Sequence, residues 1–249
     1  MWWQKNPSND RPWSPDQTIL PSAEIDGDLV HVRDIRNCAY RSRTEYTVRY
    51  YDKTFDLKEI VRMWYVLETD HKDTPHTFVS FEFNPHVFVG ISIEIRKKAG
   101  EVFSPFRACL NEYELMYVIG DENDLVKLRS NYRLHPVYVY PVKARKTFVR
   151  AFFLDMLKRV NGLKQTPELY DILTNSCAYN LFRHVNAVAP GFLTWHRCVL
   201  FPGKSDSFLH QLGLIDSDLP LKELREKSCI NERAEKYADS PDFSVKIRR

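Results

Sequence analysis

One cysteine and one histidine in this sequence have the residue types and settings that covalent catalysis needs. Cys177 lies in LTNSCAYNLFRHV, where a helix is expected to begin, and His76 heads the strand-like run HTFVSFEF. A thiol at the start of a helix ionises easily, because the first-turn N–H groups and the helix dipole favour the anion. An imidazole on a neighbouring strand is a suitable base for it. The pair therefore predicts an enzyme with a cysteine nucleophile.

The helix after Cys177 is predicted from the spacing of its apolar residues, which recur every three or four positions up to Val188. Asn175 or Ser176 can supply the N-cap oxygen, so Cys177 falls in the first turn, where its own N–H could bind an oxyanion. A buried structural thiol is the alternative interpretation. His184, two turns further on, is expected on the exposed side and is not taken as the base.

A β-hairpin over residues 76–95 is predicted to place a carboxylate beside His76. Its apolar residues alternate on both strands, and the turn at 84–86 pairs Phe83 with Val87. This register puts His76 directly opposite Glu94, where Cβ atoms are about 4.5–5.5 Å apart. Glu94 could then orient the imidazole. An ordinary cross-strand polar pair is the alternative.

Composition excludes several classes of function. The chain has 249 residues and a net charge of only +3, which gives no case for a nucleic-acid partner. Its five cysteines form no CxxC motif, which excludes a zinc ribbon or a thioredoxin motif. No metal and no cofactor is expected. Four of the cysteines are interpreted as buried structural thiols: Cys38, Cys109, Cys198 and Cys229.

Three regions are predicted along the chain. Residues 1–21 form a Pro-rich N-terminal linker, residues 22–203 a catalytic domain, and residues 204–249 a helical extension packed on it. Trp2 and Trp3 are typical of the interfacial end of a membrane anchor that has been removed, although a soluble chain can also begin this way. The sequence leaves the oligomeric state open.

Several elements are predicted inside these regions. Strands are expected at 114–120 and 137–142 and helices at 121–132 and 147–163, and Asp56 is expected to cap a short helix over 57–64. The Arg- and Tyr-rich segment 33–51 is interpreted as an irregular solvated segment, or alternatively as a surface for anionic head groups.

Several ordered blocks of the sequence resemble the bacterial Lnb N-terminal periplasmic domain family. They are NDRPWSPDQ, PHTFVSFEF, SIEIRKKAGEVFS, LNEYELMYVIGDENDLVKLRSNYR, FLDMLKRVNGL, LYDILTNSC and SDSFLHQLGLID. The resemblance extends from about Pro7 to Phe243. It departs at the cysteine, where the family often reads TNNCTT and this chain has TNSCAYN, so Ala178 replaces a hydroxyl residue.

The resemblance implies a fold and a chemistry. That family is similar to the circularly permuted, papain-like thiol enzymes of the NlpC type, so we expect an α+β fold with an antiparallel sheet and a nucleophile-bearing helix. Carried over, Cys177 is the nucleophile, His76 the base and Glu94 the orienting carboxylate. The implied reaction moves a fatty acyl group to the N-terminal amine of a lipoprotein, which makes phospholipid or lipoprotein the expected substrate and a membrane surface the expected partner.

The sequence therefore predicts a cysteine-dependent acyltransferase of the bacterial cell envelope that works through a thioester, faces the periplasm and is anchored to the inner membrane in the full-length protein. Two alternatives remain open. One is a cell-wall peptidase or amidase that uses the same three residues. The other is an envelope binding module without catalysis.

Overall fold

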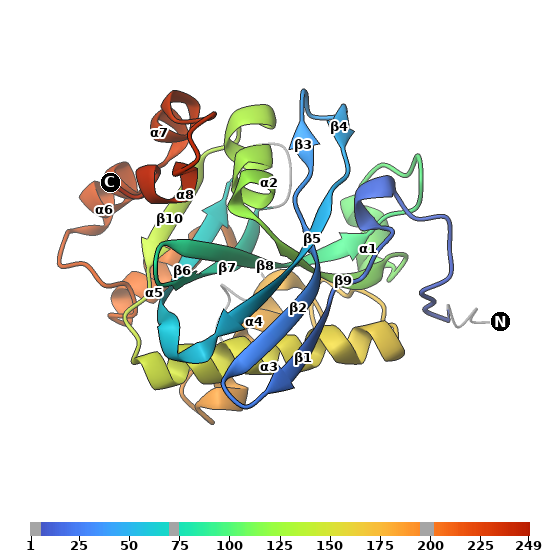
Figure 1. Ribbon diagram of the computed structural model, residues 1–249, viewed down its shortest axis with the longest axis horizontal. Coiled ribbons are helices and arrows are strands. Elements are labelled where there is room, and N and C mark those ends of the chain that lie inside the picture. The colour runs from blue at the N-terminus through green and yellow to red at the C-terminus, as the bar shows by residue number, and fades with distance from the viewer. Residues whose placement is uncertain (1–5, 70–74, 195–201) are drawn as a thin grey trace.

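An eight-stranded, mostly antiparallel sheet organises the computed structural model, which describes residues 6–69, 75–194 and 202–249 (Figure 1). The strand order is β1-β2-β9-β8-β7-β6-β10, with β5 paired to β2, and the β2–β9 pair is parallel. Strands β3 (Ala39–Tyr40) and β4 (Tyr46–Thr47) form a separate small sheet. The large sheet comprises β1 (Ser22–Asp26), β2 (Leu29–Arg36), β5 (Tyr50–Asp56), β6 (Ile60–Glu68), β7 (His76–Phe83), β8 (Val87–Arg96), β9 (Glu114–Gly120) and β10 (Val137–Pro141).

Helices cover both faces of the sheet (Figure 1). On one face, α3 (Lys146–Gln165) and α4 (Cys177–Val188) bury their apolar residues in the larger core. On the other face, α2 (Glu122–Lys127) packs with α7 (Asn231–Lys236) and α8 (Phe243–Lys246). The remaining helical segments are η1 (Pro15–Gln17), η2 (Leu57–Glu59), α1 (Pro105–Cys109), the π-helical turn η3 (Leu128–Tyr132), η5 (Pro202–Lys204), α5 (Ser205–Gln211) and α6 (Leu221–Ser228). The fold is therefore α+β, and no helix within the described residues is both long and apolar enough to cross a bilayer.

Most of the predicted elements are confirmed. The strands at 114–120 and 137–141, the acid-led helix after Asp121 and the long helix of the larger core all form. The short helix expected over 57–64 is wrong. Asp56 does cap a turn, but only η2 is helical, and the residues from Ile60 onward form β6 because this β-branched and aromatic run is buried in the sheet.

The β7–β8 hairpin has the predicted register. Phe83 pairs with Val87, Phe81 with Val89 and Val79 with Ile91. On its other edge β7 pairs with β6, where Glu68 lies directly opposite His76. His76 thus stands at one end of a central strand, between β6, which ends at Glu68, and β8, which has Glu94 near its end.

Both terminal regions pack against the domain. In the described part of the predicted linker, Gln17 hydrogen-bonds the backbone of β8, and the ring of Trp13 stacks on the guanidinium of Arg96. In the C-terminal extension, Phe243 and Ile247 are buried in the smaller core. Trp2 and Trp3 lie outside the described residues.

The Arg- and Tyr-rich segment 33–51 contributes to the fold rather than forming a free cationic surface. Arg36 is buried and donates to both carboxylate oxygens of Asp124, at 2.9 and 3.0 Å, and the Tyr40 hydroxyl donates to the same carboxylate. Arg41 pairs with Glu45. These contacts favour the interpretation of a solvated segment packed by its Tyr rings. The segment is not irregular throughout, however, because it includes β3, β4, the end of β2 and the start of β5.

Candidate active site

The predicted nucleophile is the first residue of α4. Ser176 is the N-cap, and its hydroxyl accepts a hydrogen bond from the N–H of Tyr179. Cys177 is only 5% exposed, and it lines a polar cavity of about 450 Å³ together with His76 and Glu94. The folded chain therefore brings the three predicted residues, from two strands and one helix, to the same cavity.

The pKa of the Cys177 thiol is held below its ordinary value. Burial alone would raise this pKa, but the charge of His76 and the polar groups of His76 and Thr77 near the sulfur outweigh the burial. Cys38 shows what burial does without such partners, because burial and the neighbouring charge of Asp124 raise its pKa to about 12. The pKa values of these two buried thiols thus shift in opposite directions. Of the two, only Cys177 has an imidazole beside it.

The hydroxyl of Thr77 is a site group that the sequence did not indicate. Its oxygen is fully buried and has no hydrogen-bond partner of normal geometry within the described residues, yet it lies close enough to Cys177 to lower the thiol pKa. A buried hydroxyl without a partner is costly. Its position beside the sulfur indicates that it stabilises the thiolate.

Replacing Thr77 with valine, which keeps the shape and removes the hydroxyl, should shift the alkylation of Cys177 to higher pH. A hydrogen bond to a charged group is worth about 1.5–3 kcal/mol, so the rate of iodoacetamide labelling at pH 6 should fall at least about ten-fold. Peptide mapping by mass spectrometry separates Cys177 from the exposed Cys109, which serves as an internal reference. Thr77→Ser should label like the wild type. Equal labelling rates for Thr77→Val and the wild type would show that the Thr77 hydroxyl does not stabilise the thiolate.

Glu94 reaches His76 through a serine. The Nε2 atom of His76 lies 2.8 Å from the Ser92 hydroxyl, which in turn donates to Oε1 of Glu94 at 2.8 Å. The direct contact expected from the register does not form, because Ser92 occupies the space between the two groups. With Nε2 engaged in this way, Nδ1 is the ring nitrogen left to face the sulfur. Ser92 therefore fixes the ring orientation, and Glu94 fixes Ser92.

A buried arginine holds the glutamates on both sides of His76. Arg129 donates from Nη2 to Glu94 and from Nε to Glu68, each at 2.8 Å. Glu68 also contacts Nδ1 of His135 at 2.7 Å. Burial opposes ionisation of both glutamates, but the charge of Arg129 outweighs it and holds their pKa values well below the ordinary range. The imidazole of His76 therefore stands between two carboxylates that are held by the same guanidinium.

Tyr170 adds a second polar group beside the nucleophile. The Tyr170 hydroxyl lies near the backbone N–H of Cys177, and burial raises the pKa of that hydroxyl far above its ordinary value. It is therefore neutral and able to donate a proton to another atom. The N–H predicted to bind an oxyanion thus has an O–H group beside it, and both belong to the wall of the polar cavity.

Two sequence predictions about neighbouring residues are wrong. His184 is not exposed but 5% accessible, and its ring joins Asp155 on α3 at 2.7 Å to Tyr117 on β9 at 2.8 Å. It lies seven positions after Cys177, and two turns of a helix return to the same face, so it points into the protein. Cys109 is exposed at the end of α1 rather than buried. Cys198 lies outside the described residues.

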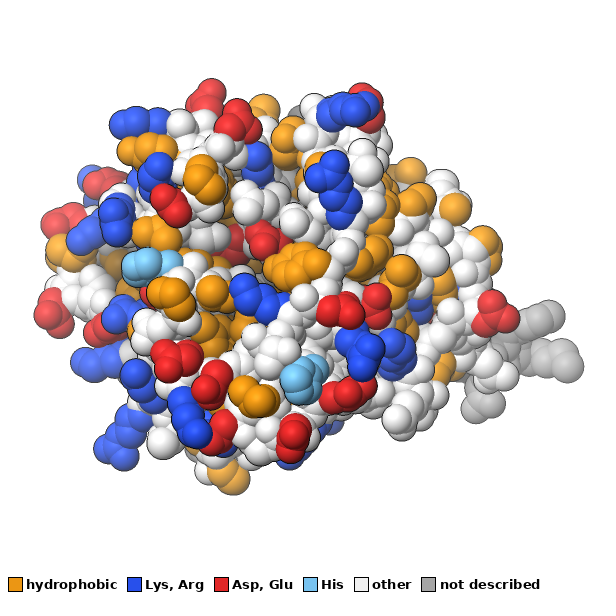
Figure 2. Space-filling view, in the orientation of Figure 1, with side chains coloured by type: hydrophobic (Ala, Val, Ile, Leu, Met, Phe, Trp, Pro, Cys, Tyr) orange, Lys and Arg blue, Asp and Glu red, His pale blue; other side chains and the backbone are white. Residues whose placement is uncertain are grey.

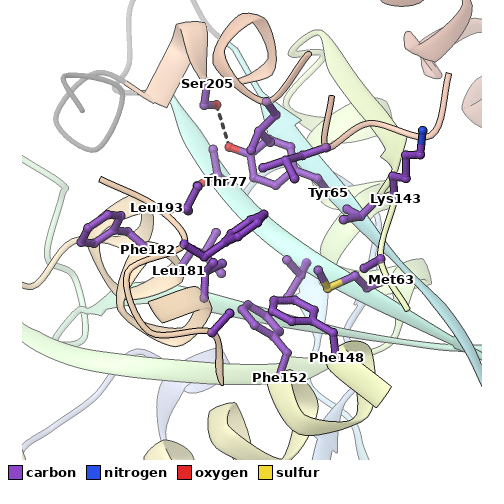
Figure 3. Close-up of a pocket in the computed structure, with 18 of the residues that line it drawn as sticks. Met63, Tyr65, Thr77, Lys143, Phe148, Phe152, Leu181, Phe182, Leu193 and Ser205 are labelled. Carbon is purple, nitrogen blue, oxygen red and sulfur yellow. Dashed lines mark hydrogen bonds between the residues drawn. The ribbon is translucent and has the colours of Figure 1, made fainter. Parts of the chain in front are cut away.

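A second, apolar cavity of about 340 Å³ lies beside the start of α4 (Figure 3). Thr77 and Ala178, the residues that follow His76 and Cys177, both line it. Phe182 and Leu193 close it from one side, and Met63, Phe148 and Phe152 from the other, while the Tyr65 hydroxyl is fixed by Ser205 at 2.6 Å. No carboxylate is among the described residues of this lining. Cys177 itself lines the polar cavity, and its neighbour Ala178 lines the hydrocarbon-lined one.

The chain was compared with known proteins in three ways. A family model described as the Lnb N-terminal periplasmic domain matches residues 46–206, which include Cys177, His76 and Glu94. Neither the curated proteins nor the solved structures include a match.

Proposed function

Because this chain belongs to the Lnb N-terminal periplasmic domain family, we propose that it is a cysteine-dependent acyltransferase of the cell envelope. The observation that carries the proposal is the Cys177 thiol, which is buried and yet has a lowered pKa because His76 and Thr77 stabilise its anion. The thiolate is the reactive form of cysteine, whereas a buried structural thiol stays protonated and unreactive. The site is therefore proposed to form a thioester.

The proposed first half-reaction transfers an acyl group to sulfur. His76 takes the proton of the Cys177 thiol, and the thiolate attacks the carbonyl carbon of an ester. The resulting oxyanion is stabilised by the Cys177 N–H and the Tyr170 O–H. The carbon–oxygen bond then breaks, and the departing alcohol oxygen takes the proton from His76. Ser92 and Glu94 keep the imidazole in one orientation throughout.

The proposed second half-reaction moves the acyl group to an amine. The amine nitrogen attacks the thioester carbonyl and gives up a proton to His76. The carbon–sulfur bond breaks, which restores the thiolate beside the imidazolium and leaves an amide as product. An acyl chain that fills the neighbouring apolar cavity would keep water away from the thioester, which favours transfer over hydrolysis.

The two cavities support a lipid acyl donor. A fatty acyl chain is apolar, and its ester and head group are polar. The hydrocarbon-lined cavity fits the chain, and the polar cavity, which Cys177 lines, fits the polar part. The order of elements, in which the His-bearing strand precedes the Cys-bearing helix, is consistent with a permuted papain-like fold. The family description supports a periplasm-facing site, and an inner-membrane anchor in the full-length protein is part of the proposal.

A cell-wall peptidase or amidase is the second candidate, and the polar cavity favours it. Its lining includes Lys97, Arg133 and Glu101, which suit a charged peptide better than a lipid. The chemistry would be the same up to the acyl-enzyme.

The two candidates are distinguished by their products. The protein is incubated separately with a mixture of phospholipid and a peptide that has a free N-terminal amine, and with soluble muropeptides. We expect an N-acylated peptide in the first reaction, its loss in Cys177→Ala, and intact muropeptides in the second. Muropeptide cleavage without peptide acylation would favour the amidase. The absence of both, with unreactive Cys177, would favour the envelope binding module.

A further inference from the structure

A group of three basic residues lies where the apolar cavity reaches the surface. Lys143 and Arg145 belong to the cavity lining and are exposed, as is Lys146 beside them; we refer to these three residues as the basic rim. Within the described residues none of the three has an ion-pair partner. Figure 2 shows Lys and Arg side chains gathered at the edge of the molecule where α3 begins.

The basic rim is not explained by the stability of the helix that it begins. It stands at the N-terminus of α3, which has no acidic residue in its first turn and no side-chain cap. Cations are unfavourable at this end of a helix, because the dipole is positive there. The three charges are therefore placed against the local preference, in a position where an external anion would offset their repulsion.

Exposed apolar side chains accompany the basic rim. Phe192 lines the same cavity and is 56% exposed, and Ala144 and Thr147 are also exposed, so the cavity opens to solvent between cations and an aromatic ring. This combination is complementary to a bilayer of acidic lipids, whose surface is negative and whose interior is hydrocarbon. A protein partner would not explain why a hydrocarbon-lined cavity opens there.

We infer that this face docks on an anionic bilayer, with Lys143 and Arg145 against the acidic head groups and the apolar cavity open to a lipid chain. The inference rests on the proposed function only for the chemistry that follows, because docking itself does not need the thiol. It also assigns membrane contact to the start of α3 instead of to segment 33–51.

The test measures co-sedimentation of the Cys177→Ala protein with vesicles, so that binding is separated from acyl transfer. Vesicles of phosphatidylglycerol mixed with phosphatidylcholine should bind the protein, and pure phosphatidylcholine should bind it at least about 30-fold more weakly, because each basic side chain near an anionic surface contributes about a five-fold factor. Added inorganic phosphate should displace the protein no better than sodium chloride at the same ionic strength.

Two double variants identify the surface. Lys143→Glu with Arg145→Glu should weaken binding to the anionic vesicles at least about 30-fold. Lys158→Glu with Lys222→Glu changes the net charge equally at two exposed lysines elsewhere and should leave binding close to that of the parent. Phe192→Asp should also weaken it. Binding that ignores lipid charge, that survives the first double variant, or that is lost equally in the control would overturn the inference. A protein that docks but forms no acyl adduct when Cys177 is restored would contradict only the proposed function.

Discussion

Replacing His76 with alanine should lower the rate of acyl-enzyme formation by about 10²- to 10⁴-fold, which is the typical contribution of a general acid–base group. The imidazole has two roles at this site. It lowers the pKa of the Cys177 thiol, and in the proposed mechanism it supplies the proton for the leaving alcohol. The rate is measured from the appearance of the acyl adduct on the intact protein after mixing with phospholipid.

Alkylation separates these two roles. Because the pKa of the Cys177 thiol is lowered through His76, the iodoacetamide reaction of His76→Ala should require higher pH than that of the wild type. His31→Ala is the matched control, since His31 is a half-buried residue of β2 whose ring hydrogen-bonds the hydroxyl of Thr54. It should retain the wild-type rate and pH profile. A His76→Ala protein that forms the adduct at the wild-type rate would show that another group is the base.

Replacing Arg129 with methionine should lower the free energy of unfolding at pH 7 by about 3–5 kcal/mol, because it leaves the buried carboxylates of Glu68 and Glu94 without their shared counter-charge. Urea unfolding followed by circular dichroism measures the change. Arg33→Met is the matched control. Arg33 pairs with Glu24 at the surface, where an ion pair contributes less than about 1 kcal/mol.

The effect of Arg129→Met should depend on pH with a defined sign. In the wild type the pKa values of Glu68 and Glu94 are lowered by folding. Their stabilising contribution is therefore present above the unfolded pKa of about 4.3 and is lost as pH falls below it. In the variant the uncompensated carboxylates can become protonated at acidic pH. The stability difference between the two proteins should thus be largest at neutral pH and shrink toward pH 4. A difference that stays constant with pH would contradict the proposed charge network.

The hairpin shows how much of the site local patterns can predict. The alternation of apolar residues in 76–95 fixed the register, and the register placed Glu94 near His76. The same alternation already put Ser92 on the face of His76, two positions along the strand from Glu94. The hydrogen bonds from His76 through Ser92 to Glu94 do not follow from directly opposite pairs alone. They also depend on diagonal neighbours, which come within contact range on a sheet.

Other parts of the site depend on contacts between distant segments. Glu68 faces His76 only because β6 pairs with β7, and no local pattern specifies which strands become neighbours. Tyr170 lies in the irregular connection between α3 and α4, where periodicity gives no information. His184 could have been placed correctly, since its spacing of seven from Cys177 returns to the same helical face. The helix predicted after Asp56 does not form beyond η2, because burial of the following residues in the sheet outweighs the helix-capping contact of Asp56.

In the proposed mechanism Cys177 carries the acyl group. The mass of the intact protein after incubation with phospholipid tests this directly. We expect the mass of the wild type to increase by one fatty acyl group. Hydroxylamine at neutral pH should remove this group, as expected of a thioester, and Cys177→Ala should not acquire it. Two results would contradict the proposed acyl-enzyme. One is an adduct of the same size on Cys177→Ala, and the other is no adduct on a wild-type protein whose Cys177 is readily alkylated at pH 6.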